Sequence, residues 1–258
     1  MSNFIYFLIN NYDYKNELYP LSKKINSTIP LNIFQTWHSK TMPPKMTICV
    51  EKLKLQNPEF NYYLYDENDC RNFIKNHYSI DILNAYDKLI PGAYKADLWR
   101  LCILHKYGGI YLDIKYQCNN NFKLIELTEH EHFCLSQAST IFADNIHGIY
   151  NALLISKPNN DFLYKCILQI VENVNNKYYG LNNLYPTGPG LLGLLYPVNR
   201  DTILDDPKFD LFYCDSSKII YNKFCILTIY EEYREEQKQY EINPHYSKLW
   251  ENKLIYQS

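Results

Sequence analysis

The chain has 258 residues, a formal net charge of -2 and 47% hydrophobic residues. This composition is typical of a globular protein and excludes an extended disordered chain, and the near-neutral charge gives no electrostatic reason to bind nucleic acid or an anionic membrane. The apolar run at residues 4–9 is too short for a signal peptide or a membrane-spanning helix. The eight cysteines form no C-x-x-C pair, which favours reduced thiols over a disulfide framework. We therefore expect a cytoplasmic protein without a membrane span.

The first third of the chain alternates between β-favouring and helix-favouring segments. After an appended segment at residues 1–28, Pro30 introduces an apolar run that predicts the first buried strand. A pair of prolines then begins a helix, and Asp66 is placed to cap the next one. The expected elements are strands at 31–37 and 60–65 and helices at 44–56, 67–77 and 80–89. This order predicts an α/β domain with a mostly parallel central sheet flanked by helices.

Residues 93–115 carry the strongest local pattern in the chain. Nothing breaks a helix between residues 93 and 107, and Gly108 ends it, as glycine commonly does. A short apolar strand at 110–112 follows and stops at Asp113. Because ligands lie beyond the carboxyl ends of the strands in an open α/β sheet, this carboxylate is placed for chemistry.

Two further charged residues lie on the helix predicted within that stretch. Asp97 and Arg100 are three positions apart, so their side chains point to the same side of the helix. A surface ion pair would explain these two residues without a site, and a turn would explain Asp113 in the same way.

The second half of the chain continues the α/β pattern. We expect strands at 133–137 and 152–156, a long helix at 160–179 and short strands between 208 and 230. The loop at 142–148 contains Asp144 and His147 and could reach a site, although turn chemistry explains both residues equally well. The charged run at 231–239 is expected as a helix or flap with a solvated face. The sequence has no linker or repeat, so residues 29–258 are predicted to form a single domain.

Two motifs in the central stretch resemble those of a known family. The sequence reads ADLWR at 96–100 and YGGIYLDIK at 107–115. It resembles the DXD-containing sugar-transferase family, which includes yeast outer-chain mannosyltransferases and the glucosyltransferase domains of clostridial toxins, and which carries S-D-x-x-R followed by Y-G-G-x-Y-x-D-x-D. Ala96 replaces the serine and Lys115 replaces the second aspartate. The resemblance implies a GT-A type, Rossmann-like nucleotide-sugar-binding fold.

The resemblance also implies which residues bind a nucleotide-sugar donor. The segment at 29–37, IPLNIFQTW, resembles the opening strand of the family, where an indole stacks on the base. Asp97 and Arg100 would hold hydroxyls of the donor sugar, and Asp113 would contact ribose or a metal-bound water. The segment at 245–250, HYSKLW, resembles the closing H-x4-W signature. The substrate-binding residues expected on this basis are Gln35, Thr36, Trp37, Gly109, Tyr111, Asn151, Thr187, Gly188, His245 and Trp250.

The reaction implied by the resemblance is the retaining transfer of a sugar from a nucleoside diphosphate to an acceptor hydroxyl. A UDP-sugar is the favoured donor and GDP-mannose the alternative, with a glycan or a protein as the acceptor. Such enzymes usually hold Mn²⁺ or Mg²⁺ with carboxylates, and the metal meets the negative charge on the leaving diphosphate. No other cofactor is implied.

Lys115 stands where the family has a metal ligand, and a charged lysine cannot coordinate a cation. If the strand stays extended, Asp113 and Lys115 point to the same face, and the ammonium lies close to the metal position. We expect Lys115 to act in catalysis with Asp97, Arg100 and Asp113 and to replace part of the charge of the metal, with Asp113 as the remaining metal ligand. Two alternatives stay open: a non-catalytic descendant that binds nucleotide sugars or glycans, or a metal ligand relocated to Asp144 or the C-terminal flap.

Overall fold

The computed structural model describes residues 14–136, 148–196, 206–240 and 244–257. In this part of the chain a nine-stranded sheet has the strand order β2-β1-β3-β6-β5-β7-β8-β9-β4. The strands are β1 (Asn32–Thr36), β2 (Asn61–Tyr65), β3 (Gly109–Leu112), β4 (Tyr116–Cys118), β5 (His132–Ser136), β6 (Ile149–Ser156), β7 (Leu211–Cys214), β8 (Lys218–Tyr221) and β9 (Phe224–Ile229). The α/β class predicted from the sequence is confirmed.

The sheet is mixed, so the expectation of a mostly parallel sheet is wrong. Among the described strands, β1 pairs in parallel with β2 and β3, and β5 with β7, whereas β6 runs antiparallel to both β3 and β5. Strands β7, β8 and β9 form an antiparallel meander, whose turns have residues with positive φ at Asp215, Ser216, Asn222 and Lys223. Such short turns return the chain antiparallel, because a parallel return needs a longer crossover.

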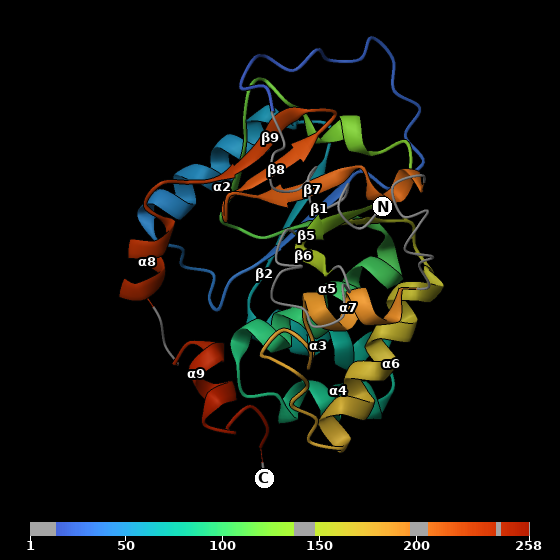
Figure 1. The fold of residues 1–258 in the computed structure, drawn as a ribbon, viewed down its shortest axis with the longest axis vertical. Helices are drawn as coiled ribbons and strands as arrows, with labels where there is room; N and C mark the ends of the chain where they lie inside the picture. Colours follow the sequence, from blue (N-terminus) through green and yellow to red (C-terminus); the bar gives the residue numbers. More distant parts are fainter. Residues whose placement is uncertain (1–13, 137–147, 197–205, 241–243, 258) are drawn as a thin grey trace.

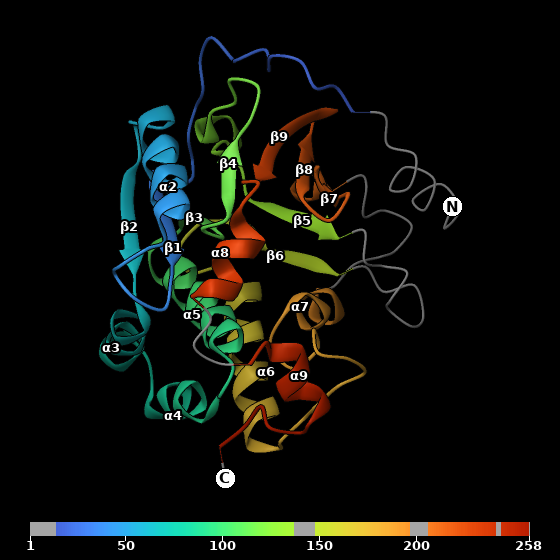
Figure 2. The ribbon, with the colours of Figure 1, turned by 90° about the vertical axis from the view of Figure 1, so that its left-hand side faces the viewer.

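Helices cover both faces of the sheet (Figures 1 and 2). They are α2 (Pro44–Gln56), α3 (Glu67–His77), α4 (Ile80–Lys88), α5 (Gly92–Tyr107), α6 (Asp161–Asn175), α7 (Pro189–Leu195), α8 (Tyr233–Gln239) and α9 (Tyr246–Glu251), with 3-10 turns η1 (Leu124–Leu127) and η5 (Pro207–Phe209). The helices predicted at 44–56, 67–77 and 80–89 are confirmed to within a residue, and Asp66 forms the expected cap on α3 as part of a capping box.

Alternate residues of the central strands serve two hydrophobic cores. Tyr111 of β3 packs in the core that contains residues of α3, α4, α5 and α6, while Ile110 and Leu112 face a second core that contains Leu53 of α2. This division follows from the two-residue period of a strand, which sends successive side chains to opposite faces. A strand buried on both faces reads as a continuous apolar run, as the sequence has it.

Helix α5 is the central helix of the fold, because every residue from Asp97 to Leu104 is buried. It ends at Gly108, which has a φ of 63°. The next glycine, Gly109, lets β3 approach β1 closely, since a Cβ there would lie 2.7 Å from the Asn32 carbonyl oxygen. The helix end and the strand start are therefore fixed by backbone geometry, and the charged residues of α5 lie beside the carboxyl end of β3.

The N-terminal segment packs on the second core. Tyr19 meets the ring of Phe122 edge-on at 4.8 Å and the ring of Phe224 at 5.3 Å. The division into an appended segment at 1–28 and a single domain at 29–258 stays a prediction.

In the second half of the chain, one predicted helix is shorter than expected, and one predicted loop lies mostly outside the described residues. The helix predicted at 160–179 ends at Asn175, and Lys177 has a φ of 48°, which no α-helix accommodates. The loop predicted at 142–148 lies, except for its last residue, outside the described residues.

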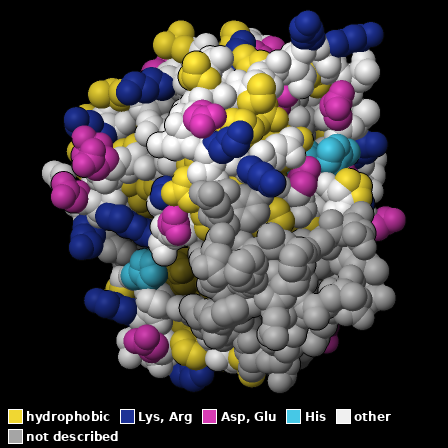
Figure 3. Space-filling model, turned by 45° about the horizontal axis from the view of Figure 1, so that its top comes forward, with side chains coloured by type: hydrophobic (Ala, Val, Ile, Leu, Met, Phe, Trp, Pro, Cys, Tyr) yellow, Lys and Arg dark blue, Asp and Glu magenta, His cyan; other side chains and the backbone are white. Residues whose placement is uncertain are grey.

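Charge is mixed over the surface. Figure 3 shows Lys and Arg side chains interspersed with Asp and Glu on the described part of one face. Over that face the small net charge thus reflects a mixture of signs rather than one charged patch. None of the helices in the described part of the chain combines the length and the apolar character needed to cross a membrane.

Candidate functional site

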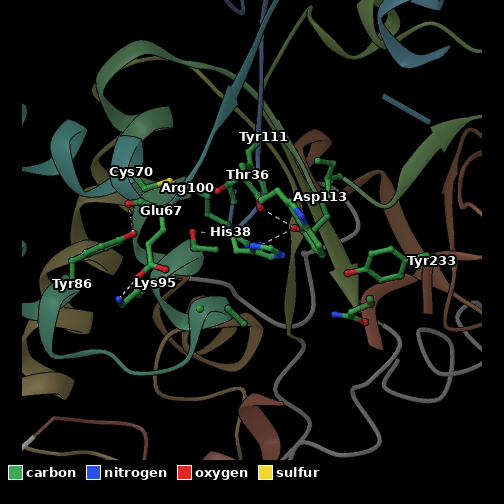
Figure 4. Close-up of a pocket in the computed structure, with 16 residues that line it drawn as sticks. Thr36, His38, Glu67, Cys70, Tyr86, Lys95, Arg100, Tyr111, Asp113 and Tyr233 are labelled. Carbon is green, nitrogen blue, oxygen red and sulfur yellow. Dashed lines mark hydrogen bonds and ion pairs between the residues drawn. The ribbon is translucent and has the colours of Figure 1, made fainter. Parts of the chain in front are cut away.

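A cavity opens at the carboxyl ends of β1 and β3, the position where ligands bind in open α/β sheets. It has two lobes, of about 250 and 530 Å³. Both lobes are lined by Ala93, Arg100, Asp113, Tyr233 and Gln237. Figure 4 shows Arg100 and Asp113 close together in the lining of the first lobe, with Tyr233 of α8 farther along it. The two lobes therefore share one wall, and that wall is charged.

A buried chain of ion pairs forms this wall. Arg100 lies 3.3 Å from Asp97 and 3.5 Å from Asp113, and Lys115 Nζ lies 2.7 Å from the Asp113 carboxylate. The side chains of Arg100 and Asp97 are only 6% and 11% exposed, so they are not the surface pair that their spacing alone allows. Charges of alternating sign in a low-dielectric interior hold one another in place. The four residues predicted to be catalytic are thus in one network.

Asp97 is held by several neighbours. Asn151 Nδ2 donates to its Oδ1 at 2.8 Å and Thr187 Oγ1 to its Oδ2 at 2.7 Å, while Arg100 donates to the Asn151 carbonyl oxygen at 2.7 Å. A Cβ on Gly188 would lie 3.3 Å from Asp97 Oδ2, so glycine lets the start of α7 come close. Burial raises the pKa of the Asp97 carboxyl above its usual value, against the opposing effects of Arg100, Thr187 and Asn151.

Asp113 and Lys115 meet although the chain between them is not extended. Tyr116 N donates to the Asp113 carbonyl oxygen at 3.1 Å, which closes a turn after β3. The strand ends before Asp113, close to the predicted stop, so the condition of an extended chain through Lys115 is not met. The Lys115 ammonium still reaches Asp113 from the turn. Tyr111 OH donates to the other carboxylate oxygen of Asp113 at 2.9 Å.

Burial and ion pairing act in opposite directions on Asp113 and Lys115. Burial alone would raise the pKa of Asp113, but Lys115 and Arg100 hold it below its usual value. Burial alone would lower the pKa of Lys115, but Asp113 raises it above its usual value. Both side chains are therefore charged at neutral pH. The ammonium also lies 5.5 Å from the ring centre of Tyr116 and 5.7 Å from that of Tyr150, which adds cation–π attraction.

The surroundings of Asp113 do not fit a divalent cation. Tyr111 and Arg100 contact one of its carboxylate oxygens, and the Lys115 ammonium stands 2.7 Å from the other. Within the described residues, Asp113 belongs to no group of three side chains that could hold a metal ion. Asp144, the candidate for a relocated ligand, lies outside the described residues. In this structure Asp113 is therefore contacted by the cationic side chains of Arg100 and Lys115.

Thr36 and Trp37 line the first lobe. The Trp37 ring lies 4.6 Å from that of His38, which also lines the lobe, and Trp37 Nε1 has no hydrogen-bond partner among the described residues. Gln35 does not line the cavity. Its amide donates to a carbonyl oxygen of β3 at 3.1 Å and accepts from Tyr62 OH at 2.8 Å, so it joins strands inside the sheet.

The predicted residues of the C-terminal segment have two different positions. His245 caps α9 and lines the second lobe. Trp250 lines neither lobe, and its Nε1 donates to a backbone carbonyl oxygen at 2.6 Å. The other predicted site residues line one or both lobes, whereas four line neither: Gln35, Gly109, Thr187 and Trp250.

Helix α8 supplies cavity residues that the sequence did not predict. The run at 231–239 was expected to have a solvated face, which is wrong for one side of the helix, because Tyr233 and Glu236 are buried. Tyr233, Arg234 and Gln237 all line the second lobe. The one local signal was a tyrosine inside a charged run, and only tertiary packing turns that side of the helix inward.

Glu236 anchors α8 to the start of α2. Its carboxylate accepts hydrogen bonds from the backbone N–H groups of Lys45 and Met46 at 2.8 and 3.0 Å and from Tyr230 OH at 2.9 Å. The first N–H groups of a helix have no partner within the helix and favour a negative charge. The contact therefore fixes α8 beside the cavity.

We expect Glu236→Ala to lower the free energy of unfolding by about 1–3 kcal/mol, because it leaves buried N–H and O–H groups without an acceptor. The matched control is Glu235→Ala, which removes an exposed glutamate from the same helix and should change stability by less than about 0.5 kcal/mol. Denaturant unfolding of both variants measures the difference. Equal stability of the two would show that Glu236 does not anchor the helix.

Comparison with known proteins gives a family match for the central part of the chain. Residues 43–134 match the family described as "Glycosyltransferase sugar-binding region containing DXD motif". Inositol phosphoceramide mannosyltransferase 3 of Schizosaccharomyces pombe is 28% identical over 192 residues, which cover 72% of this chain and 49% of that protein. An uncharacterized glycosyltransferase of Acanthamoeba polyphaga mimivirus is 30% identical over 142 residues, which cover 53% of this chain and 55% of that protein.

The solved structure of the PaToxG glycosyltransferase covers 80% of this chain and 78% of its own, with a TM-score of 0.48 and 15% sequence identity. The chain spans about half the length of the curated relatives it matches. The family match includes both motifs that form the charged wall, at 96–100 and 107–115. On the family match and the sequence relatives, residues 43–134 are similar to the glycosyltransferases whose sugar-binding region contains a DXD motif.

Proposed function

We propose that the protein transfers a sugar from a nucleoside diphosphate to an acceptor hydroxyl, and that Lys115 takes the place of a divalent metal. The observation that carries the proposal is the Lys115 ammonium, 2.7 Å from Asp113 in the wall of the second lobe. Departure of a nucleoside diphosphate builds negative charge on its oxygens, and a cation already in position lowers the barrier. Retention of configuration is proposed from the family resemblance.

Two cations are proposed to meet the diphosphate. The Lys115 ammonium has three donors, of which Asp113 uses one, so two remain for phosphate oxygens. Arg234, on α8, lines the second lobe and adds a second positive group. Since Asp97 and Asp113 balance the charges of Arg100 and Lys115, Arg234 supplies the net positive charge that an anionic donor requires.

The nucleotide is proposed to occupy the first lobe and the donor sugar the second. Trp37 offers an aromatic face for the base in the first lobe. In the second lobe Asp97 retains acceptor capacity for a sugar hydroxyl at Oδ2, which accepts one hydrogen bond from Thr187 and has a second lone pair. Its Oδ1 is contacted by both Asn151 and Arg100. Arg100 keeps this carboxylate in position from within the wall.

Both a UDP-sugar and GDP-mannose are proposed donors, with a glycan or a protein as the acceptor. A UDP-sugar is the favoured donor, whereas the name of the Schizosaccharomyces pombe relative supports mannose as the transferred sugar. A cytoplasmic location is proposed from the cysteines, all eight of which are free and buried.

A non-catalytic protein that binds nucleotide sugars or glycans is the second candidate. It is favoured by the saturation of Asp113, both of whose oxygens are contacted by groups of the protein. An enzyme and a nucleotide-sugar-binding protein both predict donor binding, and only the enzyme releases free nucleoside diphosphate from the bound donor. A glycan-binding protein predicts no donor binding.

We expect a UDP-sugar or GDP-mannose to raise the unfolding temperature in EDTA. A donor at a hundred times its dissociation constant adds about 2.7 kcal/mol of stability, which is easily measured. The measurement is thermal unfolding with a panel of donors, each compared with the donor-free protein in the same buffer, with EDTA and with Mn²⁺. Trp37→Leu should weaken the shift. A shift that requires Mn²⁺ would contradict the proposed role of Lys115, and no shift with any donor would contradict donor binding altogether.

A further inference from the structure

A second cluster of polar side chains lies away from the cavity. His130, His132 and Asp210 each offer one ligand atom, and these atoms all lie within 4.8 Å of one another. None of the three lines either lobe of the cavity. It is also the one group of three metal-ligating side chains that the described residues contain.

The geometry of the cluster is close to that of a metal site. His132 Nδ1 lies 2.6 Å from Asp210 Oδ1, and His130 Nε2 lies 3.5 Å from Asp210 Oδ2. The two imidazole rings lie 4.1 Å apart. A tetrahedral zinc ion with ligands at 2.0–2.1 Å separates its ligand atoms by about 3.3 Å. Shifts of less than about 1 Å in these side chains would bring both pairs to that separation.

The burial of the cluster suits a bound ion. The His132 side chain is fully buried, and its Nδ1 is the ring nitrogen that faces Asp210. His130 and Asp210 are 39% and 29% exposed, which gives an ion a path from solvent. The nearby Lys208 ammonium is paired with Glu131 at 3.3 Å and does not compete for Asp210.

We propose that His130, His132 and Asp210 bind a zinc ion. Imidazole nitrogen with one carboxylate oxygen is a donor set that zinc accepts, and three protein ligands leave the fourth position to water. This site is independent of the proposed sugar transfer, because it shares no residue with the cavity wall.

The ion would clamp two strands that run to the cavity. His132 begins β5 and Asp210 immediately precedes β7, and the two strands pair in parallel. At the other ends of these strands, Ser136 and Tyr213 line the second lobe. Four residues of extended strand span about 13 Å, so the ion lies too far from the cavity to take part in transfer. Its role is structural: it fixes the spacing of β5 and β7.

Thermal unfolding with zinc tests this site. We expect a hundredfold excess of Zn²⁺ over its dissociation constant to raise Tm by roughly 5–10 °C over the protein in EDTA. Native mass spectrometry should find one zinc per chain. Mg²⁺, which prefers oxygen ligands, should give no comparable shift.

Variants locate the ion. His130→Asn, at a partly exposed position, should fold normally, lose the zinc shift and lose the bound ion in the mass spectrum. The control His77→Asn removes a histidine from α3, away from the cluster, and should keep both. Asp113→Asn should also keep both, which separates this site from the cavity. An unchanged zinc shift in His130→Asn, or no zinc shift in the wild type, would overturn the proposal.

Discussion

Lys115→Met is expected to slow sugar transfer by about 10²–10³-fold, the usual loss when one placed group that stabilises developing charge is removed. Methionine keeps much of the length of the side chain and removes its charge. Asp113 retains Arg100 and Tyr111 as partners, so the fold should survive the change. Steady-state kinetics with the donor identified by thermal shift measure the effect, which should fall mainly on kcat because the charge develops as the diphosphate leaves.

A second lysine of the chain is a matched control for this variant. Lys218 also pairs with a nearby aspartate, Asp215 at 3.0 Å, and also lies over a tyrosine ring, that of Tyr14 at 4.8 Å. It lines neither lobe of the cavity. Lys218→Met should therefore retain the turnover of the wild type. Full turnover in Lys115→Met would contradict the proposed role of the ammonium.

Arg100→Met is expected to lower the free energy of unfolding by about 3–5 kcal/mol, because it leaves the buried carboxylates of Asp97 and Asp113 without their shared partner. The control is Arg71→Met. Arg71 pairs with Asp87 at 2.6 Å but is 43% exposed, so water already screens the pair and its removal should leave the unfolding midpoint almost unchanged. Denaturant unfolding at pH 7 measures both variants. Similar losses in the two would contradict the buried network.

The pH dependence of the Arg100→Met deficit gives a second test. Arg100 now opposes the effect of burial on the pKa of Asp97, so its removal raises that pKa further. The folded variant then binds a proton at a higher pH than the unfolded chain does, and its stability rises as the pH falls from neutral towards the usual carboxyl pKa of 3.8. The deficit relative to the wild type should therefore shrink over this range. A deficit that grows would contradict the assignment.

In the wild type, the ion pair of Asp113 and Lys115 should lose its contribution to stability at both low and high pH. The pKa of Asp113 is held below its usual value of 3.8, so the stability it contributes is present above pH 3.8 and is lost as the pH falls through its folded value. The pKa of Lys115 is raised above 10.5, so its contribution is complete below pH 10.5 and is lost at higher pH. Between these limits the ion pair stays intact.

Local sequence rules predicted the parts of the fold that local physics decides. Gly108 ends α5 because its positive φ closes a helix, and Asp66 caps α3 because an aspartate there accepts from the backbone of the first turn. The antiparallel sheet partners were not predicted. The contact of β4 with β9 joins residues more than a hundred positions apart, and no local pattern specifies such a pairing.

The site likewise contains residues that the sequence predicted and residues that only tertiary packing brings in. Asp97 and Arg100 share a helix, so three-residue spacing predicts their contact, and the family motif identifies Asp113 and Lys115. Tyr233 and Arg234 were not predicted as site residues, because a charged helix normally faces water. In α8, the hydrogen bonds between Glu236 and the start of α2 hold this side of the helix against the cavity.

The most direct test of the proposed metal-independent transfer is the turnover of the wild type and of Lys115→Asp, each in EDTA and in Mn²⁺. The assay is run well below the unfolding temperature in EDTA and repeated in His130→Asn, so that loss of the proposed zinc does not affect the outcome. We expect the wild type to turn over equally in both buffers, and Lys115→Asp, with the second carboxylate restored, to require Mn²⁺. A wild type that is inactive in EDTA and recovers with Mn²⁺ would contradict the substitution of Lys115 for the metal.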